Sequence, residues 1–234
     1  MRSILAEPVW GLLPLTNGVA YIKYKPYHEG RVLASFWQFS AVTGNAKQIP
    51  QELYFRLKFG EYFGSIVKQI DPSLRLSCQT AVDTGGKLMV LSPQTGDFNL
   101  FDGSGRLHRQ GALMYNGSAI SSPVFAGGDW WGICPDKNAV LRIQSGDWTW
   151  DFSVGGEGKP DFPEPVHLSA YIDREGSTRL YVCCKGSESI RSLNPDKQRL
   201  FIRDFCSLPG YQPLRYFRAA KQHLVLLADG VWAL

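Results

Sequence analysis

Five polar residues of this chain stand directly before a proline that opens a short apolar segment. They are Glu7, Asp71, Ser122, Glu164 and Gln212. Three of the five are carboxylic acids at equivalent places in the pattern. Two carboxyl groups about 5–10 Å apart can hydrolyse a glycosidic bond, and several oxygen ligands together can hold calcium. Alternatively, a polar residue in this position simply ends a loop, so the chemistry depends on the elements that carry these residues.

The five prolines are 64, 51, 42 and 48 residues apart, which indicates a repeated all-β unit. In the second copy, we predict strands over residues 75–82, 87–91, 97–101 and 106–111. Turns rich in Gly, Pro and Asp separate these strands, as is typical of an antiparallel meander. The copies therefore predict sheets of four short strands each.

The first copy has longer connections, with strands predicted over residues 10–15, 19–25, 31–39 and 52–59. Its remaining residues, 60–70, are expected to form a loop or one helical turn. In the third copy the last strand is predicted over 148–154. There Trp148 and Trp150 would share one face because their spacing is two. Such aromatic side chains either stack on a ligand or fill the wedge between neighbouring sheets.

The fifth copy has only three predicted strands, and the N-terminal segment 2–6 would supply the fourth. Pairing of the two chain ends is the arrangement that closes a β-propeller. The segment from Ala81-Val82-Asp83 to Phe101-Asp102-Gly103-Ser104-Gly105 also resembles the degenerate repeats of NHL-type propellers. The sequence thus predicts an all-β fold, a single five-bladed β-propeller of four-stranded antiparallel blades over residues 1–234. A two-sheet sandwich is the alternative.

This resemblance implies where binding would occur. In propellers the first strand of each blade lines the central channel, and the loops before it and between strands two and three share one face. The candidate binding residues at this channel mouth are Glu7, Asp71, Glu164, Gln212, His167, Tyr27 and His28. We assign no catalytic residue. We also assign no metal ligand and no cofactor, since no histidines or cysteines have zinc spacing.

Composition and net charge limit the classes of partner that we expect. The net charge is +4 without a concentrated basic run, so we expect no nucleic-acid partner. We expect no membrane partner either, because the sequence has no apolar run of membrane-spanning length. Five cysteines, an odd number, and a start without the apolar core of a signal peptide indicate a reduced, cytoplasmic setting.

These observations favour a non-enzymatic binding module that uses the loop face of a propeller. Its partner is an unknown protein or a small ligand such as a glycan. The alternative is a glycoside hydrolase-like enzyme that uses Glu7, Asp71 and Glu164. A lectin with five similar sugar sites is a third possibility, although the loops differ in length and charge from blade to blade.

Overall fold

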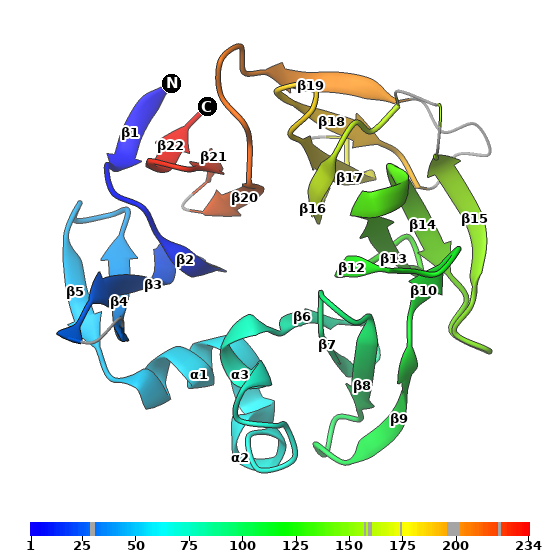
Figure 1. Cartoon of the computed structure of the whole chain (residues 1–234), viewed down its shortest axis with the longest axis horizontal. Coiled ribbons are helices and arrows are strands. Elements are labelled where there is room, and N and C mark those ends of the chain that lie inside the picture. The colour runs from blue at the N-terminus through cyan, green and yellow to red at the C-terminus, as the bar shows by residue number, and fades with distance from the viewer. Residues whose placement is uncertain (29–30, 157, 159–160, 174, 196–201, 220) are drawn as a thin grey trace. The chain divides into compact units, whose positions relative to one another are not determined.

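The computed structural model describes residues 1–28, 31–156, 158, 161–173, 175–195, 202–219 and 221–234. Within these ranges the strands form five four-stranded antiparallel sheets and one two-stranded hairpin (Figure 1). The chain is therefore all-β and has the predicted fold, a five-bladed β-propeller. We number its sheets as blades 1 to 5.

The strands of each blade follow one another in sequence, apart from the first strand of the chain. Blade 1 contains β2 (Trp10–Leu15), β3 (Gly18–Pro26), β4 (Val32–Ser40) and β5 (Ala46–Ile49). Blade 2 contains β6 (Gln79–Val82), β7 (Leu88–Leu91), β8 (Asp97–Phe101) and β9 (Leu107–Ala112). Blade 3 contains β12 (Ser121–Ala126), β13 (Asp129–Cys134), β14 (Ala139–Ile143) and β15 (Trp150–Gly155). Blade 4 contains β16 (Pro165–Ile172), β17 (Thr178–Cys184), β18 (Ser189–Leu193) and β19 (Arg203–Ser207). Blade 5 contains β20 (Arg215–Ala219), β21 (Gln222–Leu227), β22 (Gly230–Ala233) and β1 (Arg2–Leu5).

The remaining elements are short. The hairpin consists of β10 (Met114–Tyr115) and β11 (Ser118–Ala119). The helices are α1 (Gln51–Phe59), η2 (Gly60–Tyr62), α2 (Phe63–Ile66), α3 (Leu74–Ser77) and η3 (Pro135–Lys137). None of these described helices combines the length and the apolar character that a membrane span requires.

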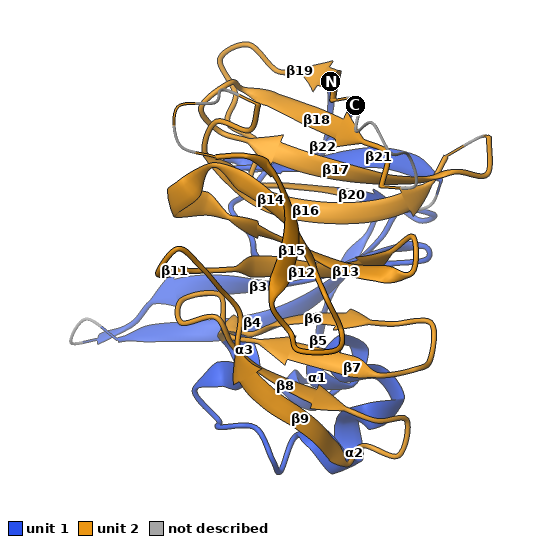
Figure 2. Cartoon of the chain, turned by 90° about the vertical axis from the view of Figure 1, so that its right-hand side faces the viewer, with its two compact units in different colours: residues 1–76, 217–234 blue, residues 77–216 orange. Residues whose placement is uncertain are grey.

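The described chain divides into two compact units, coloured blue and orange in Figure 2. Unit 1 comprises Met1–Leu76 and Phe217–Leu234, and unit 2 comprises Ser77–Tyr216. Blade 1 and the paired chain ends belong to unit 1, whereas blades 2, 3 and 4 belong to unit 2. The assignment of residues 1–234 to a single domain stays a prediction.

The predicted pairing of the two chain ends is confirmed. Strand β1 lies antiparallel to β22, and Arg2 faces Ala233 while Leu5 faces Val231. The blade 5 sheet runs in the order β1-β22-β21-β20 (Figure 1). The N-terminal strand thereby covers the edge of β22. The backbone groups on that edge gain hydrogen-bond partners that they would lack in a three-stranded blade.

The predicted strand over residues 52–59 is wrong, because this segment is helix α1. The fourth strand of blade 1 is β5, which lies earlier and ends just before Pro50. The helix buries Tyr54, Phe55 and Phe59 on one side, and Glu52 pairs with Arg56 one turn later at 2.8 Å. In a segment this short, apolar periodicity fits either a strand or a helix. Residues 60–70, left open between loop and helical turn, contain η2 and α2.

The predicted first strand of blade 2 is too long at its N-terminal end. Residues 74–77 form α3, and β6 begins only at Gln79. Asp71 favours this helical turn, because its carboxylate accepts a hydrogen bond from the Ser73 amide at 2.8 Å. The Asp71 carbonyl accepts another from the Leu74 amide at 3.0 Å. Such local hydrogen bonds compete with an extended backbone.

Blade 3 carries bulky apolar side chains on both faces of its second strand. Trp130 packs in a cluster with Phe98 of blade 2, whereas Trp131 packs in a cluster with Leu168 of blade 4. Each tryptophan is 2% exposed. Since successive strand residues point to opposite faces, these two residues fill the spaces on either side of one blade. Their role in unit 2 is packing between sheets.

Trp148 and Trp150 do not share a strand face, so that prediction is wrong. Trp148 lies in the turn before β15 with a φ of 64°, and its ring packs 4.9 Å from that of Phe98. Trp150 begins β15, is 40% exposed, and contacts Tyr115 at 4.9 Å between ring centroids. The left-handed backbone at Trp148 breaks the alternation that the spacing of two assumed.

The pairing of the chain ends predicts a sensitive glycine. A Cβ at Gly230 would lie 1.8 Å from the carbonyl oxygen of Leu5, and the φ angle of Gly230 is 146°. We expect Gly230→Ala to lower the free energy of unfolding by about 2 kcal/mol or more. The matched control is Gly64→Ala in α2, where a Cβ meets nothing within 4 Å and raises helix propensity. Chemical denaturation of both variants checks this, and equal stabilities would contradict it.

Candidate functional site

The predicted site residues are divided between the two units. Glu7, Tyr27, His28 and Asp71 belong to unit 1, and Glu164, His167 and Gln212 belong to unit 2. Each group is described below within its own unit. The role of these residues in binding stays a prediction, but their contacts distinguish structural groups from groups without a partner.

The Glu7 carboxylate is part of an ion pair in blade 1. Its Oε1 lies 2.6 Å from Nζ of Lys23, and the same ammonium lies 4.0 Å from the centre of the Trp37 ring. Burial, reinforced by the negative charge of Glu7, raises the pKa of Tyr21 to about 12. Glu7 therefore has a cationic partner, and Tyr21 stays protonated at neutral pH.

The Asp71 carboxylate is exposed and holds the turn that begins α3. It accepts hydrogen bonds from the amide of Ser73 at 2.8 Å and from its hydroxyl at 2.7 Å. The hydroxyl and then the amide of Ser73 lower the pKa of Asp71. Glu7 and Asp71, the candidate carboxylates of unit 1, thus have structural partners, and the hydrolase alternative has no support from their contacts.

In unit 2 the residues before the blade prolines are used through their backbones. Ser122 and Glu164 have φ values of 51° and 49°, which non-glycine residues rarely adopt. The Ser122 amide donates to Oε1 of Gln79 at 2.6 Å, and the Glu164 amide donates to Oδ1 of Asn138 at 2.8 Å. A side-chain amide of the preceding blade therefore holds each of these two blade starts. The Glu164 side chain itself is exposed.

Gln212 is exposed in the connection from blade 4 to blade 5. This connection is also tied to the preceding blade, because the amides of Leu208 and Gly210 donate to the carbonyl and the carboxylate of Glu188, both at 2.7 Å. In each case a residue of one blade accepts a hydrogen bond from an amide at the connection to the next blade. Because the residue types differ, the sequence alone did not reveal this contact.

Tyr27 and His28 lie at the end of the long β3–β4 hairpin of blade 1. Their rings make an edge-on contact at 5.4 Å between centroids, and both side chains are exposed. The strands of this hairpin also carry an exposed surface whose residues were not singled out as site residues.

That surface follows from the strand register. Tyr24 faces Ala34, Pro26 faces Val32, and Trp10 faces Ile22 across the sheet. Residues directly opposite one another share a face, as do residues two apart. We call the exposed set on this face the ribbon face, and it comprises Trp10, Tyr24, Pro26, Val32 and Ala34. All five are exposed and apolar or aromatic, and the rings of Trp10 and Tyr24 meet at 5.2 Å.

The same face is buried farther along the hairpin. Ile22 and Phe36 are opposite each other, and Phe36 packs on Tyr54 and Phe55 of α1 at ring distances of 5.1 and 6.2 Å. The Tyr54 hydroxyl donates to the carbonyl of Gly11. Helix α1 thus covers one half of a continuous apolar stripe, and the ribbon face is the half without a cover among the described residues.

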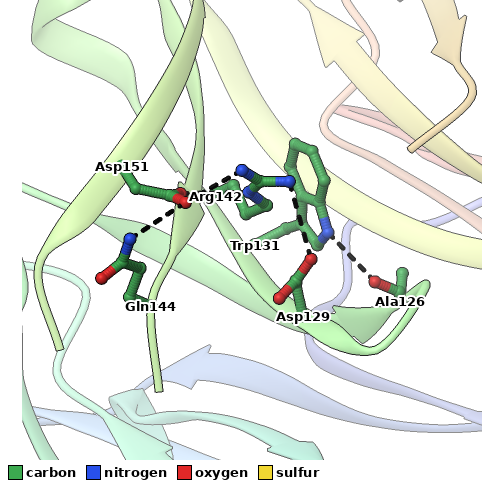
Figure 3. A network of polar contacts seen from close by, with 6 residues as sticks. All are labelled: Ala126, Asp129, Trp131, Arg142, Gln144 and Asp151. Atoms are coloured by element: carbon green, nitrogen blue, oxygen red, sulfur yellow. Dashed lines mark hydrogen bonds and ion pairs between the residues drawn. The ribbon is translucent and has the colours of Figure 1, made fainter. Parts of the chain in front are cut away.

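A polar network in blade 3 is closed on itself (Figure 3). The Arg142 guanidinium donates to both carboxylate oxygens of Asp151 at 3.0 and 2.9 Å and lies 3.8 Å from Asp129. Gln144 donates to Asp151 at 3.2 Å. The hydrogen bond from Arg142 lowers the pKa of Asp151. These contacts join β13, β14 and β15, so the network is structural.

His167 lies on β16, the first strand of blade 4. Its side chain is half-buried, and its Nδ1 is buried without a hydrogen-bond partner in the part of the chain that the structure describes. Burial, aided by the positive charge of Arg215, lowers the pKa of His167 well below its usual value of 6.5. The imidazole is therefore neutral at pH 7.

The cysteines do not form a nucleophilic site with this histidine. Cys183 is opposite His167 in the sheet, but burial is the main cause that raises the pKa of the Cys183 thiol. Burial likewise raises the pKa of Cys184 to about 12. A thiol that stays protonated is a poor nucleophile. Among the described residues, no three His, Cys, Asp or Glu side chains are grouped to hold a metal ion.

Comparison with known proteins supports the fold. No family model and no curated protein matches the chain. YCF48 bound to D1 peptide is similar with a TM-score of 0.57 and 8% identity, over 99% of this chain and 94% of that one. Virginiamycin B lyase from Staphylococcus aureus is similar with a TM-score of 0.50 and 11% identity, over 100% and 72%. Identities this low establish shared architecture only.

The backbone contact at Ser122 predicts a stability effect. We expect Gln79→Ala to lower the free energy of unfolding by about 1–2 kcal/mol, because the Ser122 amide loses its acceptor. The matched control is Gln110→Ala on the exposed strand β9, which we expect to change stability by less than about 0.5 kcal/mol. Urea denaturation checks both, and an equal loss in the two variants would contradict the role of Gln79.

Thiol reactivity tests the burial of the cysteines. Cys134, Cys183 and Cys184 are 0% exposed, Cys78 is 5% exposed, and Cys206 has intermediate exposure. We expect Cys206 to react first with a disulfide reagent in the native protein at pH 8, and all five thiols to react after denaturation. Cys206→Ser should remove the fast phase. A fast phase that survives this substitution would show that a buried thiol is accessible.

Proposed function

We propose that this protein is a non-enzymatic binding module and that the ribbon face of blade 1 binds a protein partner. The observation that carries the proposal is the continuous apolar stripe of β3 and β4, of which α1 covers only one half. Trp10 is 46% exposed, Tyr24 37% and Val32 58%. Aromatic side chains of this kind contribute most to binding energy when a partner buries them.

The energetics favour such a partner. Complete burial of one large apolar side chain contributes about 1.5–3 kcal/mol. Trp10, Tyr24 and Val32 are already partly buried, so they would supply part of the binding energy, and further contacts around them would have to offset the cost of association. A projecting two-stranded ribbon is also only marginally stable alone, so a partner on the ribbon face would stabilise it.

The charge around the hairpin defines the chemistry of the partner. Lys25 and Arg31 are exposed on the same hairpin, and Lys25, which is directly opposite Leu33, points away from the ribbon face at its edge. The Tyr27 amide donates to the carbonyl of Arg31 at 2.8 Å, which fixes the hairpin end. We therefore propose a partner that presents an apolar segment with acidic residues beside it. Its binding should weaken as salt is added, since exposed charges are screened.

One similar structure supports a polypeptide partner, because YCF48 was solved bound to D1 peptide. We also propose a reducing, cytoplasmic setting. The odd number of cysteines, five, supports this setting.

Two neighbouring residues of β4 allow a face-selective test. Val32 lies on the ribbon face, whereas Leu33, which is 54% exposed, points to the opposite face. A photo-crosslinking amino acid at position 32 of the full chain, in its native cells, should give a crosslinked protein that the same group at position 33 does not give. Mass spectrometry identifies that protein.

Binding of the purified partner then decides the proposal. Val32→Asp should weaken binding at least about tenfold, or about 1.4 kcal/mol, whereas Leu33→Asp should have a much smaller effect. Circular dichroism confirms that both variants are folded. The absence of crosslinks, crosslinks of equal yield at the two positions, or equal affinities of the two variants would overturn the proposal.

A further inference from the structure

Two first strands of unit 2, β12 and β16, carry buried polar atoms that have no hydrogen-bond partner in the described part of the chain. Strand β12 lies beside both β6 and β16. Ser122 on β12 and Ser169 on β16 are 4% and 7% exposed. Their hydroxyl oxygens, and Nδ1 of His167, are buried with no hydrogen-bond partner among the described residues. Each such group destabilises the fold unless something binds it, and native proteins leave few of them unsatisfied.

Two of these groups share one face of β16. His167 and Ser169 are two residues apart, whereas Leu168 and Ala170 point to the other face and pack in the core with blade 3. Tyr171 continues the face of His167 and meets the ring of Tyr216 on β20 at 5.9 Å. The face that carries His167 and Ser169 is therefore turned toward the start of β20.

Arg215 begins β20 and makes this face positive. Burial is the main cause of the lowered pKa of His167, and the positive charge of Arg215 adds to it. The same charge acts to lower the pKa of Cys183, against the larger effect of burial. Whatever other contacts Arg215 makes, its charge is permanent. A neutral imidazole and a serine hydroxyl add hydrogen-bond donors next to that charge. Donors beside a guanidinium suit an oxyanion.

We propose that His167, Ser169 and Arg215 form a binding site for one oxyanion, the carboxylate or phosphate group of a small ligand. The anion accepts hydrogen bonds from the Ser169 hydroxyl and the imidazole, and its charge is balanced by the guanidinium. The His167 side chain is partly exposed, but its Nδ1 and the Ser169 hydroxyl are buried, so neighbouring side chains have to move for the anion to reach them. This site belongs to unit 2 and does not depend on the ribbon face of unit 1.

Nitrogen-correlated NMR of the histidine rings tests the proposal on the full chain. Inorganic phosphate and acetate are titrated separately at constant pH and ionic strength, and His167→Gln assigns the ring signals. We expect the His167 signals to shift saturably while those of His108 do not move. A response to phosphate alone identifies a phosphate site, a response to acetate alone a carboxylate site, and a response to both a general oxyanion site.

Variants separate this site from a general effect of anions. Ser169→Ala and Arg215→Gln should each weaken binding at least about tenfold, and Arg215→Lys should restore part of it. Arg203→Gln on β19, an exposed arginine of blade 4, which also carries His167 and Ser169, is the matched control and should bind as the unmodified protein does. We expect the Ser169→Ala variant to remain folded, because the substitution removes only one oxygen atom.

Three outcomes would overturn the proposal. The first is that neither anion shifts the His167 signals, which would leave water as the partner of the buried donors. The second is an unchanged response in both Ser169→Ala and Arg215→Gln, provided that the variants are folded. The third is an equal loss in Arg203→Gln. Val32→Asp should leave anion binding intact, so failure of the ribbon face proposal is distinguishable from failure here.

Discussion

The blades of this protein carry apolar side chains on both faces, and one blade by itself would expose these side chains to water. Strand β7 is buried along its whole length, and adjacent Trp130 and Trp131 need cover on opposite sides of β13. Each face of a blade in unit 2 therefore has to pack against a neighbouring sheet. Apolar burial is the main favourable term in folding, so stacking of sheets is the condition for the remaining contacts.

The same requirement explains the irregular part of blade 1. Its apolar stripe at Ile22 and Phe36 is covered by a helix rather than a strand, because residues 51–59 bury Tyr54 and Phe55 on one side. The ring contacts of the helix with the stripe are at Phe36. The uncovered remainder at Tyr24 and Val32 is where the protein has apolar surface left for a partner, and the proposed function follows from that incomplete cover.

Polar residues at the blade starts are divided between structural and unsatisfied groups. Glu7 and Asp71, whose types suggested catalysis, are held by Lys23 and Ser73. The donors of His167 and Ser169 on the inner strand β16 lack partners among the described residues. The groups available to bind a ligand are therefore those whose hydrogen bonds are incomplete. The pattern of carboxylates before prolines mainly reflects how each blade begins.

The sequence by itself determined the number of blades and the pairing of the chain ends, because turn residues and strand alternation are local signals that repeat. It failed at residues 51–59 and at Trp148, where short apolar spacing fits more than one backbone conformation. Only the tertiary structure decided that Tyr24 and Val32 stay exposed while Ile22 and Phe36, on the same face, are covered. The physical reason is that burial depends on which element packs against a face, and that element is distant in sequence or, as we propose for the ribbon face, belongs to another molecule.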